Sequence, residues 1–569
     1  MSLKAQNNIT SNKQFIRLAY FISLLLLPYS TPIIAEIQTS QANYLSITID
    51  GLAYDLTLTT NPRFHQHSTS NSTAQHFSGF INQNPDSWVR LSHIKNQWQG
   101  VVSIDGNIHN ITPSNSTADT EGNIVVSSLP PERSTPLQCG ATNTLSPQTF
   151  SAAKTIENQT IENQTINYST LCTDTINGIC IVAELELAFD QAFQSRYPDN
   201  AEDQANSLIN IVEGYYINDM NIGFNQITSE LLSTVTFSPS TDALSLLGDI
   251  QSKKANQQLT FIKNDAALFH LITGREFDTS TVGVAYLGAL CDTNGFSVGT
   301  SQLVSGNIPL TALVVAHEIG HNMGASHDDP ANEICESGFI MAPSLSSFAS
   351  QFSSCSIENI QSNISNTNNI EQCVNFAADI AITANDNNVT SSEHTDTTTD
   401  NFTITISSLY QSVTTISVTG TLSTTDTSIP LNGQFIAVSL PGTTCTIASD
   451  GFSYQCILNT STPSNTLTIS TTGTNTSLDM THSVSIINPS TVIDINNSNN
   501  TYVRSLTINT TVATDTEEDS TTPEDTSTPE VGDATTSSTN ASTNSGGGGG
   551  GSINWGLLVG IFLTSLKRK

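Results

Sequence analysis

The sequence predicts an α/β domain built on a twisted mixed sheet, with a β-rich region before it and an all-β sandwich after it. Between residues 179 and 377, strand-like and helix-like apolar runs alternate, and a helical run with several histidines comes late. Residues 36–140 and 380–512 instead carry short runs in which apolar and polar residues alternate, separated by turn residues. Alternation with a period of two indicates strands, whereas a helix repeats about every 3.6 residues. Regions of these three kinds can each bury a core between packed layers.

The chain is strongly acidic and begins with a segment typical of exported proteins. It has 50 Asp and Glu against 17 Lys and Arg, which is a formal net charge of −33 at pH 7. Such a surface repels nucleic acid and anionic membranes and favours solubility outside the cell. Residues 1–35 hold a basic start, an apolar run and Ala35 as a last residue before cleavage, which predicts a secretory signal peptide. The apolar run is too short for a permanent membrane anchor.

The region after the signal peptide, residues 36–140, is expected to consist of strands. Tyr44 to Leu58 alternates as a strand does, and Phe77 to Ile111 indicates several more strands. The connector that follows, residues 141–178, is rich in Asn and Thr and repeats the pentapeptide IENQT. This composition indicates an exposed segment, in which we expect the cut that frees the next domain.

The α/β domain is predicted over residues 179–377. Val182 to Phe189 is expected to be a strand, Ala201 to Tyr216 a helix, and Ile222 to Ile227 the next strand. The late helical run is expected to begin at Pro309, because proline suits the first position of a helix.

This late helix carries the sequence HEIGHNMGASHD at residues 317–328. His317 and His321 are four residues apart and therefore share one helix face, and His327 follows beyond the end of the helix. Three neutral imidazoles leave the fourth position of a tetrahedral Zn²⁺ open for water, as in catalytic rather than structural sites. Glu318 is placed to take the proton of that water, whose pKa the metal lowers. The sequence therefore predicts one zinc ion per chain and Glu318 as the catalytic residue.

The extended motif H-E-x-x-H-x-x-G-x-x-H, followed by Met341, resembles that of the metzincin zinc peptidases. HLITG at 270–274, GVAYLGALCD at 283–292 and FSSCS at 352–356 are similar, in this order, to landmarks of the adamalysin/reprolysin (ADAM-like, M12B-type) family. The stretch 76–111 resembles the propeptide of the same family.

The resemblance implies a secreted zinc endopeptidase, made as a zymogen, that hydrolyses extracellular proteins or peptides through a zinc-bound water. It implies that Gly283 to Gly288 form the edge strand on which an extended substrate lies. Ile340 to Pro343 would wall the pocket for the side chain after the scissile bond, with Met341 as a packed floor beneath the metal. Asp328 would fix the zinc loop. Phe339 stands where the family usually has a cysteine, so this loop is less cross-linked than in relatives.

Cys139 precedes the α/β domain and is the candidate for an inhibitory cysteine switch. A thiolate is a strong zinc ligand, so Cys139 can take the position of the catalytic water and hold the zymogen inactive. The chain has nine cysteines, so one is left over from disulfides. The family's switch also has a Cys-Gly pair, here Cys139 and Gly140. The alternative is that Cys139 pairs with Cys172 or Cys180.

The remaining eight cysteines are expected to form disulfides. Two pairs are implied by the resemblance, and two further pairs would close short loops if they form: Cys291–Cys373 and Cys335–Cys355, and Cys172–Cys180 and Cys445–Cys456.

A second metal is a further expectation from the resemblance. Some relatives hold a structural Ca²⁺ far from the zinc, and the nearest matches to its ligands are Glu184, Asp265 and Asn375. Oxygen ligands suit calcium. The alternative is that these are ordinary solvated side chains.

Residues 380–512 are predicted to form a sandwich of Ig-like type, because six short alternating runs recur there with turn residues between them. This region is either a spacer or a module that binds substrate or a surface. If it is the working part and the metal domain is a relic, the protein is a surface adhesion or binding protein; the intact Glu318 argues against this. A zinc hydrolase of non-peptide amides is a third reading, disfavoured by the edge-strand and propeptide resemblance.

The C-terminal end is expected to carry a linker and a sorting signal. Residues 513–545 are rich in Thr, Ser, Pro and acidic residues and are predicted to be a solvated tether. Six glycines, an apolar run and three basic residues then fill residues 546–569, a layout that resembles the GlyGly-CTERM signals of Gram-negative bacteria. The resemblance implies a bacterial protein that export machinery and a rhombosortase-type protease process, with only transient membrane contact before release or surface attachment. An ordinary C-terminal anchor is the alternative.

Overall fold

The structure is a computed structural model, and all the residues it describes belong to one compact unit that ends at residue 510. The predicted signal peptide apart from its last two residues, most of the connector, the linker and the C-terminal sorting signal lie outside the described residues. The residues that the structure describes are 34–35, 44–61, 63, 74–82, 84–113, 124–128, 137–140, 167–328, 338–345, 349–384, 390–391, 397–409, 415–424, 431, 433–459, 462–473, 477–487 and 491–507.

The N-terminal region forms one eight-stranded sheet in which neighbouring strands are antiparallel, in the order β1-β8-β7-β6-β5-β4-β3-β2. The expectation of a single strand over Tyr44 to Leu58 is wrong. Asp50 and Gly51 have φ angles of 51° and 81°, and such a two-residue turn lets the alternation continue into a second strand. The strands are β1 (Ile34–Ala35), β2 (Tyr44–Ile49), β3 (Leu52–Thr60), β4 (Gln75–Ile81), β5 (Asn84–Ile94), β6 (Gln97–Ile104), β7 (Asn107–Pro113) and β8 (Ile124–Ser128).

The central region is built on a mixed sheet, as the sequence predicts. Its strands follow the order β15-β9-β13-β14-β12-β10-β16, with β11 also paired to β10. Strand β10 is parallel to β11 and β12, whereas β13 is antiparallel to β14. The elements are β9 (Leu137–Cys139), α2 (Tyr168–Leu171), β10 (Ile181–Phe189), α3 (Gln191–Arg196), α4 (Ala201–Met220), β11 (Ile222–Leu231), α5 (Ala243–Ala255), β12 (Leu268–Thr273), β13 (Thr281–Ala285), β14 (Val298–Gln302), α6 (Ile308–Asn322), β15 (Ser344–Leu345), α7 (Ser354–Asn366), η4 (Ile370–Gln372) and β16 (Val374–Ala384).

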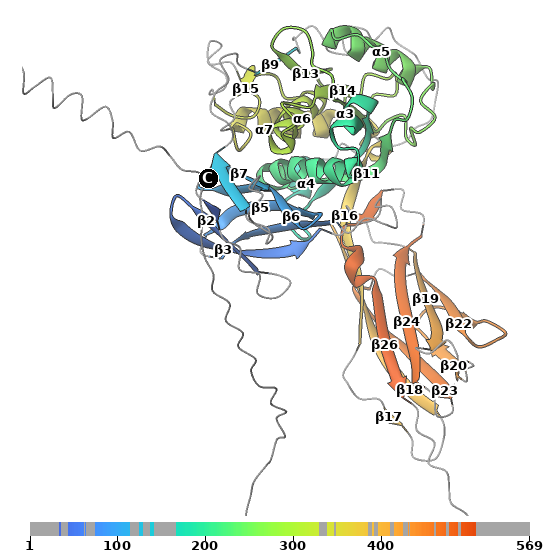
Figure 1. Ribbon diagram of the computed structural model, residues 1–569. Coiled ribbons are helices and arrows are strands. Elements are labelled where there is room, and N and C mark those ends of the chain that lie inside the picture. The colour runs from blue at the N-terminus through green and yellow to red at the C-terminus, as the bar shows by residue number, and fades with distance from the viewer. Residues whose placement is uncertain are drawn as a thin grey trace, which may run out of the picture. The chain divides into compact units, whose positions relative to one another are not determined.

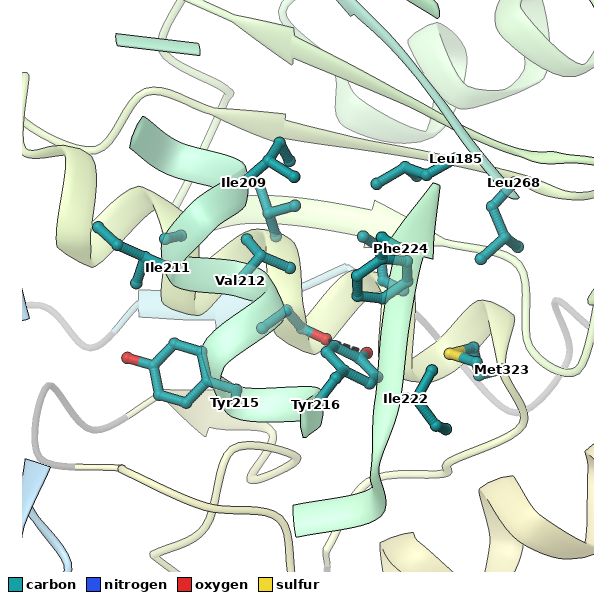
Figure 2. Close-up of a cluster of buried hydrophobic side chains, with 14 of the residues drawn as sticks. Leu185, Ile209, Ile211, Val212, Tyr215, Tyr216, Ile222, Phe224, Leu268 and Met323 are labelled. Carbon is teal, nitrogen blue, oxygen red and sulfur yellow. Dashed lines mark hydrogen bonds between the residues drawn. The ribbon is translucent and has the colours of Figure 1, made fainter. Parts of the chain in front are cut away.

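Helix α4 supplies much of the core of this region (Figure 2). Its buried Ile209, Val212 and Tyr216 pack with Phe224 of β11, and the Tyr216 and Phe224 rings meet edge to face at 5.0 Å. The Tyr216 hydroxyl donates to the main-chain oxygen of Ala316 in α6 at 2.8 Å. The predicted helix is therefore confirmed, and its core face connects the first half of the region to α6, the helix that contains His317 and His321.

The C-terminal region consists of two sheets that share a core with residues of both, among them Ile404, Val418 and Val484. The boundary expected between residues 377 and 380 falls inside one continuous strand, β16. This strand pairs with β10 near Phe376 and with β18 near Ile380, so one sheet runs from the α/β region into the β region. The elements are β17 (Thr390–Ser391), β18 (Thr397–Ser408), β19 (Ile416–Thr424), β20 (Gly433–Ser439), β21 (Cys445–Ile447), β22 (Ser453–Leu458), β23 (Ser464–Gly473), β24 (Ser477–Ile486), β25 (Val492–Asp494), η5 (Asn497–Asn499) and β26 (Thr501–Thr507).

Figure 1 shows α4 lying along the N-terminal sheet, where it contacts β4, β5 and β6. Among the described helices, none combines the length and the apolar character that crossing a membrane requires.

Candidate metal centre

Helix α6 is defined at both ends by short-range contacts. The side chain of Asn307 accepts a hydrogen bond from the Leu310 N–H at 2.9 Å, and Pro309 follows in the first turn, where no N–H is needed. Beyond the last residue of the helix, Gly324 has a φ of 110°, which favours glycine, and a Cβ there would lie 2.6 Å from the Asn363 side chain. The chain therefore reverses tightly at this point, which carries His327 back toward the helix.

The three predicted histidines come together. Nε2 of His327 lies 3.3 Å from Nε2 of His317 and 3.1 Å from Nε2 of His321. A tetrahedral zinc with bonds of roughly 2.0–2.1 Å to nitrogen needs ligand nitrogens about 3.3 Å apart. Together with Cys139, these side chains form the one group of three or more His, Cys, Asp or Glu ligands found within the described ranges.

The orientation of two of the rings also fits a metal. Nδ1 of His317 lies 2.6 Å from the main-chain oxygen of Ile340, and Nδ1 of His321 lies 2.7 Å from that of Ala325. An Nδ1–H that donates to a carbonyl leaves the lone pair of Nε2 for a metal ion. Burial lowers the pKa of His317 to about 3 and that of His321 well below its ordinary value, so both rings are neutral. The residues present therefore fit zinc.

Glu318 is fully buried beside the three rings. Burial raises the pKa of its carboxyl to about 8, and the hydrogen bond from Cys139 opposes this shift. Oε1 of Glu318 is buried and has no hydrogen-bond partner among the described residues, so it can accept a hydrogen bond from a water or a substrate. Gly283 of β13 makes room for this carboxylate, because a Cβ there would lie 2.6 Å from Oε1.

Met341 and Asp328 hold the segments around the three histidines in place. The Met341 sulfur lies so close to the helix that a Cβ on Gly320 would come within 2.6 Å of it. The Asp328 N–H donates to the Met341 main-chain oxygen at 2.8 Å, and the buried Asp328 carboxylate accepts from the hydroxyls of Ser353 and Ser356 at 2.7 and 2.8 Å. Asp328 thereby joins the histidine loop to the start of α7.

Strand β9 brings Cys139 to this centre. Its Sγ lies 3.4 Å from Oε2 of Glu318 and 3.4 Å from Nε2 of His321. For thiolate and imidazole bound to one tetrahedral zinc, bonds of about 2.3 and 2.05 Å give a separation near 3.6 Å. Cys139 belongs to no disulfide, so the alternative pairing with Cys172 or Cys180 is wrong.

The strand is held along both edges by main-chain hydrogen bonds. On one side it runs parallel to β13, and Gly140 N–H donates to the Gly283 oxygen at 2.9 Å. On the other side it runs antiparallel to β15, and Cys139 N–H donates to the Pro343 oxygen at 3.4 Å. The Leu137 side chain is buried against the α/β core. The groove between β13 and β15 therefore accommodates an extended peptide.

The other predicted site residues are the disulfide cysteines and the candidate calcium ligands. The disulfides that involve described residues on both sides are Cys172–Cys180, Cys291–Cys373 and Cys445–Cys456. Cys355 is disulfide-bonded, and its expected partner Cys335 lies outside the described residues.

The candidate calcium residues are brought together only in part. Both oxygens of Glu184 accept amide N–H groups, from Asn375 at 3.0 Å and from Asn264 at 2.5 Å. Asp265 instead accepts from Gln257 at 2.8 Å. Amide protons occupy the oxygens that a cation would need, so this arrangement does not fit calcium.

One residue that the sequence analysis did not single out is Asn322, at the end of α6. The buried Asn322 donates through Nδ2 to the main-chain oxygens of Tyr286 and Val298 at 2.8 and 3.0 Å. It fixes the metal helix to the end of β13 and the start of β14. Asn322 could have been noticed in the sequence because it directly follows the second histidine. The sequence does not show, however, that its side chain bonds the main chain at Tyr286 and Val298.

Comparisons with known proteins agree with this geometry. Residues 181–353 match the family model described as Reprolysin_5, Metallo-peptidase family M12. Snake venom metalloproteinase TM-1 of Protobothrops mucrosquamatus is 42% identical over 105 residues, which are 18% of this chain and 50% of that protein. Zinc metalloproteinase-disintegrin-like kaouthiagin-like of Naja atra is 47% identical over 96 residues, 17% of this chain and 16% of that protein. Zinc metalloproteinase-disintegrin-like brevilysin H2a of Gloydius brevicauda is 43% identical over 106 residues, 18% of this chain and 24% of that protein.

The matched part of the chain thus spans half or less of the length of these relatives. The similarities support an adamalysin-type metzincin domain over residues 181–353, with a mixed sheet and a zinc-binding centre.

Proposed function

We propose that this chain is a secreted zinc endopeptidase, made as a zymogen in which Cys139 closes the metal centre. One observation carries the proposal. Three converging imidazole nitrogens and a buried carboxylate meet a thiol that an extended strand delivers between two strand edges. A site with these three features suits cleavage of an extended peptide and its inhibition by a segment of the same chain.

Zinc bound by the three histidines would supply Lewis acidity, which lowers the pKa of a water and polarises a peptide carbonyl. Glu318 would take the proton of the attacking water through Oε1 and return it to the leaving amine. The Ile340 and Ala325 carbonyls keep two rings in the orientation that this chemistry needs.

The groove favours a peptide over a small non-peptide amide. The contacts of β9 with Ser280, Gly283 and Pro343 use main-chain atoms on both partners, at 3.0, 2.9 and 3.4 Å. A substrate can use the same edges whatever its side chains are, because every peptide carries the same main-chain groups. Extracellular proteins are the proposed substrates.

The zymogen state rests on the position of Cys139. The Cys139 sulfur lies beside His321 and Glu318, so as a thiolate it would compete with water for one position on a bound zinc. Secretion rests on the signal-peptide pattern at residues 1–35 and on the name of one relative, Snake venom metalloproteinase TM-1. We further propose that residues 546–569 act as a sorting signal that a rhombosortase-type protease removes, before release or attachment at the surface of a Gram-negative cell.

The experiment uses the exported full chain and its Glu318→Ala partner, each before and after limited proteolysis of the connector. Casein cleavage is measured with and without a zinc chelator, and the bound zinc is counted. The proposal expects chelator-sensitive cleavage by the parent once the N-terminal part has been cut off and separated, none by the partner treated in the same way, and one zinc in both. Zinc binding without cleavage, even after the segment with Cys139 has been removed, would contradict it and favour an adhesion or binding protein.

A further inference from the structure

Helix α4 buries two faces of opposite character. Tyr215 and Tyr216 point in different directions from it (Figure 2). Tyr216 lies on the apolar face that packs on the α/β core, whereas Tyr215 meets Trp88 of the N-terminal sheet edge to face at 5.2 Å. The fit is close, since a Cβ on Gly214 would lie 2.8 Å from both the Trp88 ring and the Arg90 side chain.

The face toward the N-terminal sheet is polar. Glu213 is fully buried, and its Oε2 accepts from Arg63 at 2.6 Å and from Asn61 at 3.2 Å. Asn210 donates to the main-chain oxygens of Phe77 and Leu91 at 3.1 and 3.3 Å. One turn and a half earlier on the helix, Gln204 and Ser207 both contact Gln99 of β6.

This composition differs from that of a permanent core. A helix that is always buried on all sides is apolar all round, whereas a polar face indicates a surface that also meets water. Asn210, Gln204 and Ser207 can be hydrated once the sheet has left, and while it is bound each has a partner across the contact. Glu213 is shared: its Oε2 bonds the N-terminal part, whereas its Oε1 accepts the Phe224 N–H of β11 at 3.1 Å. Interfaces between separable partners have this mixed composition, with aromatic anchors such as Trp88 and paired polar groups.

The N-terminal sheet is also connected along the chain to the strand that contains Cys139. Strand β9, with Cys139, belongs to the same N-terminal part of the chain as β4 to β6. If this part stays on α4 after a cut in the connector, the thiol remains close to the metal centre. Two contacts on one partner act together, because the second binds at a high effective concentration once the first has formed.

We propose that the polar face of α4 is a docking surface for the N-terminal sheet that holds it after the chain has been cut between Gly140 and Asn167. The Arg63–Glu213 pair governs the strength of this contact. Activation then takes two steps, cleavage of the connector and separation of the sheet from α4. This inference rests on the proposed zymogen, but the α4 contact is independent of the metal and the thiol.

The test uses the full chain with a recognition sequence for a specific protease in place of the IENQT repeats, in a Glu318→Ala background. After cutting, size-exclusion chromatography and a dilution series measure whether the two fragments separate. The parent fragments are expected to co-elute. Glu213→Gln is expected to raise the dissociation constant about thirtyfold or more, because it leaves Arg63 without its charged partner.

The matched control is Asp199→Asn. Asp199 forms an ion pair with Lys95 across the same boundary, but at 3.6 Å and with side chains 80% and 53% exposed. Exposed pairs contribute little, so we expect a change of less than about threefold. Arg63→Gln repeats the test from the other side and leaves the α/β region unaltered, which covers the case that Glu213→Gln does not fold.

Cys139→Ser separates the two contacts. Its fragments are expected to remain together after cutting, because α4 still holds the sheet. Separation of the Cys139→Ser fragments, or equal behaviour of Glu213→Gln and Asp199→Asn, would overturn the inference. Since elution reports binding alone, a failure to cleave casein would count against the proposed peptidase and leave this result untouched.

Discussion

The N-terminal part of the chain contacts the α/β region in two places, at the metal centre and at α4, and the two contacts are built differently. At the metal centre, β9 is held by main-chain hydrogen bonds and one thiol. At α4, the contact consists mainly of side chains, with Trp88 on Tyr215 and Arg63 on Glu213. Main-chain groups are common to all peptides, so a substrate can replace β9. Side-chain pairs are specific, so the α4 contact recognises only this partner.

The largest expected effect concerns the chemistry at the metal contact. Glu318→Ala, in protein from which the N-terminal part has been removed, is expected to lower the rate of casein cleavage by about 10²–10⁴-fold, because it removes the proton acceptor. The zinc content should stay the same, since the histidines are unaltered. Activity near that of the parent would show that another group takes the proton.

The next effect tests whether the thiol or the strand closes the groove. Cys139→Ala in the uncut chain is expected to raise peptidase activity by an order of about 10², because one of two cooperating contacts is lost. The matched control is Gln138→Ala, since the neighbouring Gln138 is exposed and, within the described part of the chain, its side chain accepts a hydrogen bond from the Ser280 hydroxyl alone. If both variants stay as inactive as the parent, the main-chain contact alone suffices and the thiol has no inhibitory role.

A smaller effect is expected where β13 passes the carboxylate. Gly283→Ala would place a Cβ 2.6 Å from Glu318 Oε1, so we expect a loss of about 1–3 kcal/mol in unfolding free energy together with reduced activity. Gly248→Ala in α5 is the control, because a Cβ there meets nothing within 4 Å and the helix should gain up to about 1 kcal/mol. Denaturant unfolding measures both. If the two variants had the same unfolding free energy, the Glu318 carboxylate would be shown to move away from the new Cβ without loss of stability.

The smallest effect is a pH response on the side of α4 that faces the α/β region. Burial raises the pKa of Asp219 from 3.8 to about 6, although the carboxyl accepts the Phe352 N–H at 2.7 Å. The folded state therefore binds this proton more tightly than the unfolded chain does. Its favourable contribution is present below pH 4 and is lost as the pH rises through about 6.

In the parent, this contribution is expected to change the unfolding free energy by about 1–3 kcal/mol between pH 4 and pH 7. Asp219→Asn is expected to remove this pH dependence. Thermal unfolding across that range measures it, with Asp199→Asn as the exposed control. The response should be the same with and without the N-terminal sheet, because Phe352 belongs to the α/β region. A response that vanishes when the sheet is removed would place Asp219 in the other contact.

The features of the site that could be predicted from the sequence are those that depend on residues close together in the chain. His317 and His321 share a helix face by their spacing alone, and Pro309 lies in the first turn of α6 as expected. The alternation of strand and helix patterns likewise predicted an α/β region built on a sheet. The single strand expected at Tyr44 to Leu58 was wrong because a two-residue turn preserves the period of two.

By itself, the sequence determined the candidate metal ligands, the order of the elements and the candidate thiol, because each depends on residues close together in the chain. Only the tertiary structure decided which partners meet across long separations. It brings Cys139 to Glu318, Arg63 to Glu213 and Asn322 to the strand ends, and it runs β16 through the expected domain boundary. The physical reason is that a buried polar group needs a partner, but its own residue type does not say which distant group will supply it.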